Sequence, residues 1–442
     1  MTTLPYPGAH PQLTDAIDLL FGTPDLSLPG TARFKATAAG LMVSVDGANW
    51  VLMPALTPAP FYTAVRNVKQ PYPVGSPTFP GAVGDGTTDD TAAFVYYMGL
   101  GPGQVFVPVG TYRVKPGFTI SSGIRLFGEN HAFTRLKVDD SLGNAGADVF
   151  TSTNQRGWAV EGMTIDAPSG RTAGRMFMIK GGDSSEQLVL GISSGGNYID
   201  VDSNNQFMGV EFADNAGIGD FRTTIGDPKR RAWWRNMSAG AGFGIFFNTP
   251  HGASQVVNNV FITGAVGATG PAVWYRGSGD ITLNGVQTFG MSGWVFDPQA
   301  NCAAALDASI QMNNCQWDSG GPAATPNMLW TCGPSFNAAA CVVFAQLTNN
   351  WVAGATGDGV KITGPGLRDR LYFDWKSGAC YSNTGFGINV TDTLATVLDF
   401  AGNPQINVSI ASSTNGAGGS ALTNTTLGIP FRSNGSGAKS YT

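Results

Sequence analysis

Two aspartates separated by one residue are the first candidates for chemistry in this sequence. Asp200 and Asp202 lie in the segment 198–202, Tyr-Ile-Asp-Val-Asp, in which polar and apolar residues alternate. On a β-strand this alternation points Tyr198 and both carboxylates to one face, away from the apolar side chains. Residues two apart on a strand are separated by ~6.6 Å, which lies within the ~6.5–9.5 Å that separate the carboxylates of inverting glycoside hydrolases. The pair therefore predicts acid–base hydrolysis of a glycosidic bond.

A third carboxylate, Asp166, follows the apolar segment Val160–Ile165. If that segment forms the neighbouring strand, ~4.8 Å away, we expect Asp166 beside Asp200. Crowded carboxylates raise one another's pKa, which suits a general acid. A solvated strand face would explain the same aspartates without any chemistry. Other carboxylates in the same stretch are rival candidates: Glu211, Asp214 and Asp220.

Adjacent tryptophans are the candidates for substrate binding. Trp233 and Trp234 lie in the arginine-rich segment 230–236, which we expect to form a loop inserted between two strands. Tryptophan rings on such a loop could stack on sugar rings, and Arg235 could contact sugar hydroxyls or acidic groups. The alternative is a loop that packs on the protein or on another subunit. Together with Tyr198, these residues form the predicted substrate-binding site.

No cofactor or metal site is expected. The five cysteines form no Cys-x-x-Cys pair, and we expect them as small buried residues. The formal net charge of −5 argues against a nucleic-acid partner, and no apolar stretch approaches the ~18 residues of a membrane span. Residues 1–12 lack the pattern of a signal peptide, so we expect folding in a cytoplasm and release by another route such as lysis.

The elements that position these residues are expected to be short strands. Glycine accounts for 61 of the 442 residues and charged residues for only 12%, whereas hydrophobic residues reach 42%, which favours a folded, mostly β chain. Short apolar-alternating segments recur at a spacing of ~20–40 residues, which predicts a β-solenoid. Asparagines end several of these segments, among them Asn258, Asn284, Asn313 and Asn349. They predict either a side-chain ladder between coils or simple turns.

The N-terminal part of the chain has a different pattern. Within residues 1–60, apolar alternation around Asp46-Gly47 predicts a hairpin in a small β-module. Seven prolines between Pro54 and Pro80 are incompatible with a helix or a central strand, so residues 61–78 are expected to form an extended neck. Residues 413–442 are expected to be a Gly/Ser-rich tail.

The segment Phe79–Phe94, which contains Gly-Asp-Gly-Thr-Thr-Asp-Asp-Thr, resembles the opening motif of the pectate-lyase-like superfamily. Gly103–Tyr112 and Ile124–Glu129 resemble the two elements that follow it. The resemblance implies a right-handed parallel β-helix over residues 79–412, capped at one end by a glycine-rich loop and a short helix at Asp90–Gly99. It also implies structural, not catalytic, roles for the motif carboxylates, which are Asp85, Asp89 and Asp90.

The superfamily includes pectate lyases, polygalacturonases, and phage tailspikes and depolymerases. The polygalacturonase motifs Gly-His-Gly and Arg-Ile-Lys do not occur here, and no dense carboxylate cluster for the calcium of the lyases is evident. The overall organisation is most similar to phage tailspikes. This resemblance implies a homotrimer of the virion tail that joins a tail or baseplate protein through residues 1–60 and binds and hydrolyses host cell-surface polysaccharide. The alternative is a non-catalytic virion protein that uses the helix as a rigid stalk and receptor surface.

Overall fold

The computed structural model of the chain describes residues 33–37, 40–44, 51–52, 65–73, 78–181, 196–213, 222–237, 240–249, 254–297, 308–318, 325–331, 343–363, 371–391, 405–413, 420–423, 431–433 and 439–441. The chain divides into two compact units, Met1–Thr63 and Ala64–Thr442. Among the described residues the only α-helix is α2 (Thr91–Gly99), and strands make up most of the rest.

The first unit contains a three-stranded antiparallel sheet of β1 (Arg33–Thr37), β2 (Gly40–Ser44) and β3 (Val51–Leu52). Met42 of β2 pairs with Leu52 of β3, so the connection between these two strands includes Asp46-Gly47. The predicted small β-module is therefore present, although the turn itself lies outside the described residues.

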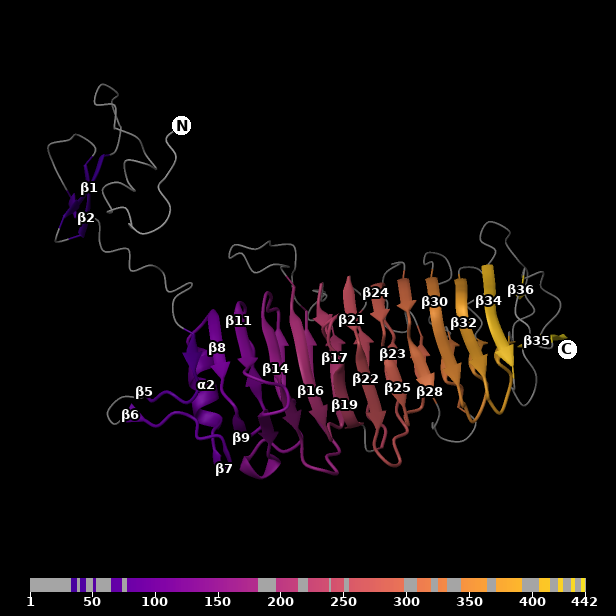
Figure 1. The fold of residues 1–442 in the computed structure, drawn as a ribbon, viewed down its shortest axis with the longest axis horizontal. Helices are drawn as coiled ribbons and strands as arrows, with labels where there is room; N and C mark the ends of the chain where they lie inside the picture. Colours follow the sequence, from indigo (N-terminus) through magenta and orange to yellow (C-terminus); the bar gives the residue numbers. More distant parts are fainter. Residues whose placement is uncertain are drawn as a thin grey trace, which may run out of the picture. The chain divides into compact units, whose positions relative to one another are not determined.

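The second unit is a parallel β-helix (Figure 1). Each coil contributes two strand segments to a 20-stranded sheet and one to a 12-stranded sheet. We call the outer surfaces of these three positions the first, second and third face. One coil illustrates them with β11 (Ile124–Gly128), β12 (Thr134–Val138) and β13 (Phe150–Thr153).

Strands at equivalent positions in successive coils pair in parallel. β21 (Gln255–Asn258) pairs with β24 (Gly279–Asn284) in this way, and Val257 stands opposite Leu283. The same pairing continues through the expected tail, because β34 (Gln405–Ser413) pairs with β36 (Phe431–Ser433) and β35 (Ser420–Thr423) with β37 (Lys439–Tyr441). The β-helix thus extends beyond residue 412.

The interior is filled by side chains that alternate with outward-facing ones along each strand. Phe118, Phe150 and Phe177 stack in three successive coils, with ring centroids 5.6 and 5.1 Å apart. Such offset ring pairs add ~0.5–1.5 kcal/mol to the hydrophobic gain of burial. Cys315 and Cys380 are buried thiols, and burial raises the pKa of each to about 12. The other three cysteines lie outside the described residues.

Asparagines perform both of their predicted roles at the corner between the first and second faces. Asn284 donates to the side-chain oxygen of Asn258 at 3.0 Å, and Asn313 donates to that of Asn284 at the same distance. Asn259 and Asn314, one residue further on, turn the chain in the left-handed region with φ of 48° and 54°. Each corner therefore combines an amide ladder between coils with a residue type that tolerates positive φ.

Helix α2 covers the N-terminal end of the β-helix and buries Phe94 against its core. Asp90 precedes the helix but does not cap it with its side chain. Its carboxylate instead accepts hydrogen bonds from the backbone N–H groups of Val83 and Gly84, at 2.6 and 3.2 Å. Asp90 thus ties the glycine-rich loop to the helix, which confirms a structural role.

The other two motif aspartates close turns of their own. Asp85 accepts from the backbone N–H groups of Thr87 and Thr88, both at 2.8 Å, and Asp89 accepts from that of Thr91 at 3.0 Å. All three motif carboxylates are therefore used by the cap of the β-helix.

The expected neck is partly integrated into the second unit. Within residues 61–78, β4 (Arg66–Asn67) pairs in parallel with β8 (Gly103–Val107), and Val68 is fully buried in the core. The Arg66 guanidinium donates to the carbonyls of Gly101 and Pro102, at 2.7 and 2.9 Å, just beyond the end of α2. The β-helix unit accordingly includes Arg66, upstream of the motif at Phe79 from which it was expected to start.

Candidate functional site

Asp200 and Asp202 lie on β16 (Tyr198–Asn204), one of the long strands that spans the first and second faces. Ile199 and Val201 point into the core, as the alternation predicted. A single guanidinium holds both carboxylates: Arg230 Nη2 lies 2.6 Å from Asp200 Oδ1, and Nη1 lies 2.9 Å from Asp202 Oδ1. The two aspartates are therefore neighbours in space that share one cation.

His131 completes the surroundings of Asp200. Its Nε2 lies 3.1 Å from the backbone carbonyl of Asp200 and 3.3 Å from Oδ2 of the carboxylate. Because the carbonyl only accepts hydrogen bonds, Nε2 must carry a proton. The histidine comes from the loop between β11 and β12, and its own carbonyl accepts from the hydroxyl of Thr164 at 2.5 Å. The ring is thereby fixed against the strand.

The electrostatics of Asp200 differ from the expectation. Its burial raises the pKa of the carboxyl, but the hydrogen bonds from His131 and Arg230 outweigh burial, so the pKa is lowered. A carboxylate with a lowered pKa stabilises the folded chain above the ordinary carboxyl pKa, and this contribution is lost as the pH falls through the lowered value. Asp200 is therefore ionised at neutral pH, which suits a base and not an acid.

The backbone supports this arrangement from the next coil. The N–H of Trp233, on β19 (Ala232–Met237), donates to Asp202 Oδ1 at 2.9 Å.

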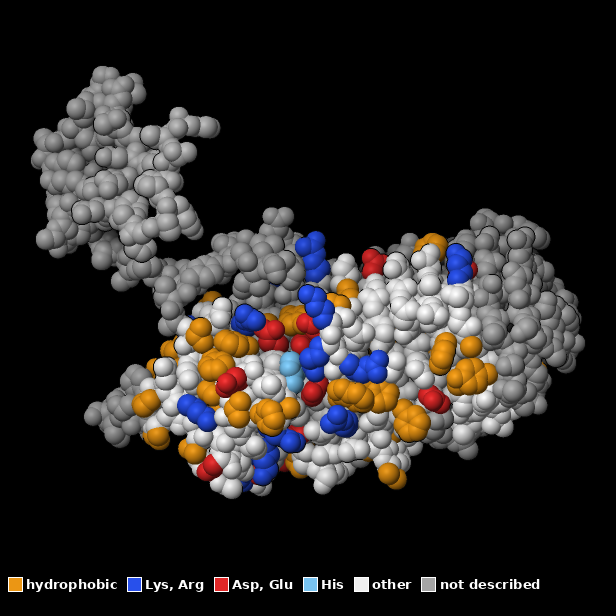
Figure 2. Space-filling model, in the orientation of Figure 1, with side chains coloured by type: hydrophobic (Ala, Val, Ile, Leu, Met, Phe, Trp, Pro, Cys, Tyr) orange, Lys and Arg blue, Asp and Glu red, His pale blue; other side chains and the backbone are white. Residues whose placement is uncertain are grey.

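The pKa of Tyr198 is raised by burial of its hydroxyl and by the carboxylates around it, Asp200 first among them, so the phenol stays protonated. Figure 2 shows acidic and basic side chains gathered over the middle coils of the face that it draws.

Asp166 does not lie beside Asp200. On β14 (Ala159–Asp166) the residue opposite Asp200 is Glu161, and Asp166 stands opposite Asn204. Asp166 is held by the guanidinium of Arg135, 2.6 Å away, and by the amide of Asn204 at 2.5 Å. The prediction that Asp166 lies beside Asp200 is therefore wrong.

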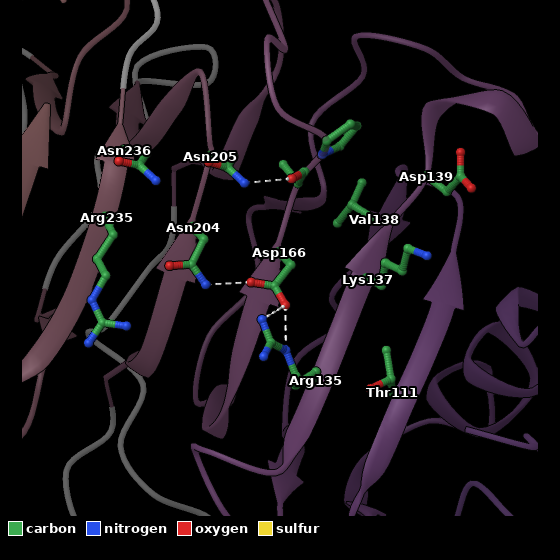
Figure 3. Close-up of a pocket in the computed structure, with 12 residues that line it drawn as sticks. Thr111, Arg135, Lys137, Val138, Asp139, Asp166, Asn204, Asn205, Arg235 and Asn236 are labelled. Carbon is green, nitrogen blue, oxygen red and sulfur yellow. Dashed lines mark hydrogen bonds and ion pairs between the residues drawn. The ribbon is translucent and has the colours of Figure 1, made fainter. Parts of the chain in front are cut away.

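Asp166 belongs to a groove of about 780 Å³ on the second face (Figure 3). The groove crosses five successive coils, from β9 (Gly110–Val114) to β19. Its outward-facing lining residues on these strands include Thr111, Arg135, Lys137, Asp166, Asn204 and Arg235. Charged side chains are thus combined with hydroxyl and amide groups along its floor.

The groove adjoins the aspartate pair. Strand register places Arg135 opposite Thr164 and Thr164 opposite Asp202, so the groove and Asp202 share one row of outward-facing residues. A chain-like ligand in the groove would therefore lie close to Asp202, the more exposed member of the pair.

Residues 80–317 match the sequence pattern of the family described as rhamnogalacturonase A/epimerase, pectate lyase-like, which is more than half of the chain. The chain belongs to this family. Membership confirms the right-handed parallel β-helix that the opening motif predicted.

Solved structures with this architecture are similar to the pectate lyase-like chain at low identity. The A-module of the mannuronan C-5 epimerase AlgE4 of Azotobacter vinelandii is 15% identical, covers 86% of this chain and 97% of its own, and has a TM-score of 0.42. ORF18 of Geobacillus virus E2 is 16% identical over 95% and 73%, with a TM-score of 0.40. Tailspike gp49 of the Acinetobacter baumannii bacteriophage Fri1, described as a capsular polysaccharide depolymerase, is 12% identical over 83% and 68%, with a TM-score of 0.38. Comparison with curated proteins found no match.

The two tryptophans of the platform predicted for this pectate lyase-like protein point in opposite directions. The segment 230–236 is not a loop throughout, because its second part forms β19. Trp234 is fully buried and donates from Nε1 to the carbonyl of Val201 at 3.0 Å, so it cannot contact a substrate. Trp233 faces outward, and the guanidinium of Arg235 lies 5.1 Å from its ring. Trp233 and Arg235 therefore remain available for binding.

Of the three rival carboxylates only Glu211 lies in the described part of the chain, and it does not join the site. Glu211 lies on β17 (Met208–Ala213), in the other sheet, where it is buried and paired with Arg175. Asp214 and Asp220 lie outside the described residues. Glu161, on the coil before Asp200, is paired with Arg125.

Contributors that the sequence did not single out include Arg230, His131, Arg135 and Lys137. The alternation Thr-Arg-Leu-Lys-Val in β12 does carry a signal for the last two, because Leu136 must face inward. His131 follows no such pattern, since it lies in a connection whose path is set by the coil.

Within the described ranges, no three His, Cys, Asp or Glu side chains are grouped as a metal would require. No helix of the described part is both long and apolar enough to cross a membrane.

Proposed function

We propose that this protein is a phage tailspike that binds the polysaccharide of a host cell surface in the groove between β9 and β19. The observation that carries the proposal is the groove itself, which is open along the helix axis and lined by amides and ionised side chains. Sugar hydroxyls both donate and accept hydrogen bonds, as such a lining requires. The family supports a carbohydrate ligand, because its description names a rhamnogalacturonase and pectate lyase-like proteins.

The charges of the groove favour a saccharide with acidic groups. Asp166 is neutralised by Arg135, and Asp139, the other lining carboxylate, by Arg113 at 2.6 Å. No carboxylate among the described residues forms an ion pair with Lys137 or Arg235. Lys137 and Arg235 lie three coils apart in one row of outward-facing residues. At ~4.8 Å between neighbouring coils, the two residues are ~14 Å apart. In a chain of net charge −5, this is a local site for anions.

Replacing either cation with alanine is expected to weaken binding of an acidic polysaccharide by about tenfold, because each removes a charge-assisted hydrogen bond. Affinity electrophoresis in gels that contain polygalacturonate, alginate or dextran measures the effect for Lys137→Ala and Arg235→Ala. Arg231→Ala is the matched control, since Arg231 is exposed and does not line the groove. Equal mobility of all three variants and the wild type in every gel would contradict the assignment of this groove as the polysaccharide-binding site.

Hydrolysis of the bound polysaccharide is the second candidate function, favoured by the two outward aspartates at the groove. In this mechanism Asp200, held ionised, takes a proton from a water molecule that attacks the anomeric carbon, and Asp202 donates a proton to the departing glycosidic oxygen. Arg230 stabilises the ionised forms of both carboxylates. Substrate binding must therefore displace its guanidinium from Asp202 before that residue can hold a proton.

We further propose that residues 1–60 attach the protein to a phage tail or baseplate protein, and that the β-helix forms a homotrimer in the virion tail. The separate first unit supports the attachment role. The low content of charged residues supports association, because few charges keep the long sheet faces solvated.

A chain that starts at Ala64 is expected to remain trimeric and to bind polysaccharide as well as the full-length protein, but to be missing from assembled virions. Starting at Ala64 keeps β4, Val68 and the Arg66 contacts with the end of α2. Light scattering measures the trimer and immunoblotting of purified particles measures incorporation. A stable monomer at micromolar concentration contradicts the trimer, and normal incorporation contradicts the attachment role.

A further inference from the structure

A row of outward side chains continues along the second face from the groove toward the C-terminal coils. Strand register places its members opposite one another in five successive coils: Trp233, Phe261, Gln287, Gln316 and Trp351. They lie on β19, β22 (Val260–Gly264), β25 (Gln287–Phe289), β28 (Gln316–Asp318) and β30 (Val343–Ala353). The row begins beside the aspartate pair, since the Trp233 N–H binds Asp202.

The two ends of this row are aromatic and its centre is polar. Trp233 meets Phe261 edge to face with ring centroids 5.0 Å apart, and Trp351 meets Tyr381 of the next coil in the same manner at 6.4 Å. Trp351 is 46% exposed, although tryptophan is one of the side chains that gains most from burial. Phe289, in the adjacent row, is 50% exposed. Exposed aromatic rings on one sheet face are candidates for a ligand-binding surface.

The chemistry of the row differs from that of the groove. None of its five side chains is charged, whereas the groove carries Arg135, Lys137, Asp166 and Arg235. The amides of Gln287 and Gln316 each offer a donor and an acceptor. Aromatic rings flanking amides match an uncharged sugar, which has an apolar face formed by C–H groups and a rim of hydroxyls.

The spacing also matches a saccharide chain. Adjacent residues of the row are one rung apart, ~4.8 Å, and an extended glycan advances by nearly the same length with each sugar. Trp233 and Trp351 are four rungs apart, ~19 Å. A glycan that leaves the groove along the helix axis can therefore place one sugar on each residue of the row, first on the two amides and then on Trp351.

We propose that this row is a second saccharide-binding platform, on which Trp351 stacks against an uncharged sugar of the same glycan chain that occupies the groove. Gln287 and Gln316 bind the hydroxyls of the intervening sugars. The platform rests on the proposed function, because its ligand is the part of the polysaccharide that extends beyond the groove. It makes affinity depend on glycan length, since a short fragment fills the groove without reaching Trp351.

The test compares Trp351→Ala with a matched control, Phe344→Ala. Phe344 is 42% exposed and lies on the same strand, but it pairs with Ser309 on the first face and not with the row. Affinity electrophoresis uses xanthan and rhamnogalacturonan, in which acidic and uncharged sugars occur in the same chain. In the gels that retard the wild type, Trp351→Ala is expected to lose about tenfold in affinity, whereas Phe344→Ala keeps wild-type affinity. Disaccharide fragments of the same polysaccharide should compete equally against wild type and Trp351→Ala.

Each other outcome overturns a defined part of the proposal. Wild-type affinity of Trp351→Ala, together with weakened binding by Arg235→Ala, overturns the platform and leaves the groove in place. If no polysaccharide retards the wild type, both the platform and the proposed function are overturned. A change in mass by light scattering for Trp351→Ala, without a change in affinity, assigns this surface to contacts between copies of the chain instead.

Discussion

Asp200→Asn is expected to lower the rate of polysaccharide cleavage by ~10²–10⁴, the usual cost of losing a general base. The carboxylate is ionised at neutral pH because His131 and Arg230 stabilise its charge. An amide of the same size cannot accept the proton of the attacking water. Reducing ends released from host surface polysaccharide measure the rate, and Asp202→Asn should show a loss of similar size because it removes the proton donor.

The control for this experiment is Glu161→Gln. Glu161 stands directly opposite Asp200 on the preceding coil and also forms an ion pair with an arginine, but it makes no contact with Arg230 or His131 among the described interactions. It should retain full turnover. Because Asp200 is 6% exposed, Asp200→Asn also weakens a buried ion pair, so circular dichroism must show that the variant is folded.

Two results separate the candidate functions. If the wild type cleaves and both aspartate variants keep full turnover, the catalytic pair is misplaced. If the wild type binds polysaccharide but releases no reducing ends, the protein is the non-catalytic receptor-binding alternative. In that case Arg230 serves to neutralise two carboxylates on a stalk, and the groove remains the ligand site.

The orientation of the aspartates could be predicted from the sequence because strand alternation is a local property. The segment Tyr198–Asp202 contains all the information needed to point Ile199 inward and both carboxylates outward. The opening motif likewise identified the fold, since the loop and helix of the cap are built from contiguous residues. Features of this kind require no knowledge of the rest of the chain.

The partners of the aspartates could not be predicted, because strand register is a property of whole coils. β14 and β16 shift register between Glu161 and Met163, where Gly162 has a φ of 75°. The lengths of the intervening loops decide that Glu161 stands opposite Asp200, and the bulge then sets Asp166 opposite Asn204. Similarly, Arg230 reaches both carboxylates from a turn closed by the pairing of Asp227 and Arg230.

The adjacent tryptophans show a local signal that the arginine-rich composition obscured. In Ala232-Trp233-Trp234-Arg235, the first and third side chains are buried and the other two face outward, which is the period of a strand. The arginines of this segment suggested a loop. Only one of two adjacent tryptophans can face solvent in a strand, and the alternation with Ala232 indicates which.

This difference between neighbours predicts a large and unequal effect on stability. Trp234→Ala is expected to lower the free energy of unfolding by ~3–5 kcal/mol, because it opens a cavity in the core. The Trp234 ring is fully buried and packs against Gly209, where an added Cβ would come within 3.1 Å of the ring. The truncation also leaves the carbonyl of Val201 without its hydrogen bond, directly between the two aspartates. Urea denaturation followed by circular dichroism measures the loss.

Trp233→Ala is the matched variant and should lower the free energy of unfolding by only ~1 kcal/mol. It removes two ring contacts, the edge-to-face contact with Phe261 and the cation–π contact with the guanidinium of Arg235. Its effect should appear in affinity for polysaccharide, whereas Trp234→Ala should alter affinity only as far as it unfolds the chain. Equal stability losses for the two variants would contradict the placement of Trp234 in the core. If Trp234→Ala instead remained fully stable but lost binding, both tryptophans would bind sugar, as the sequence alone predicts.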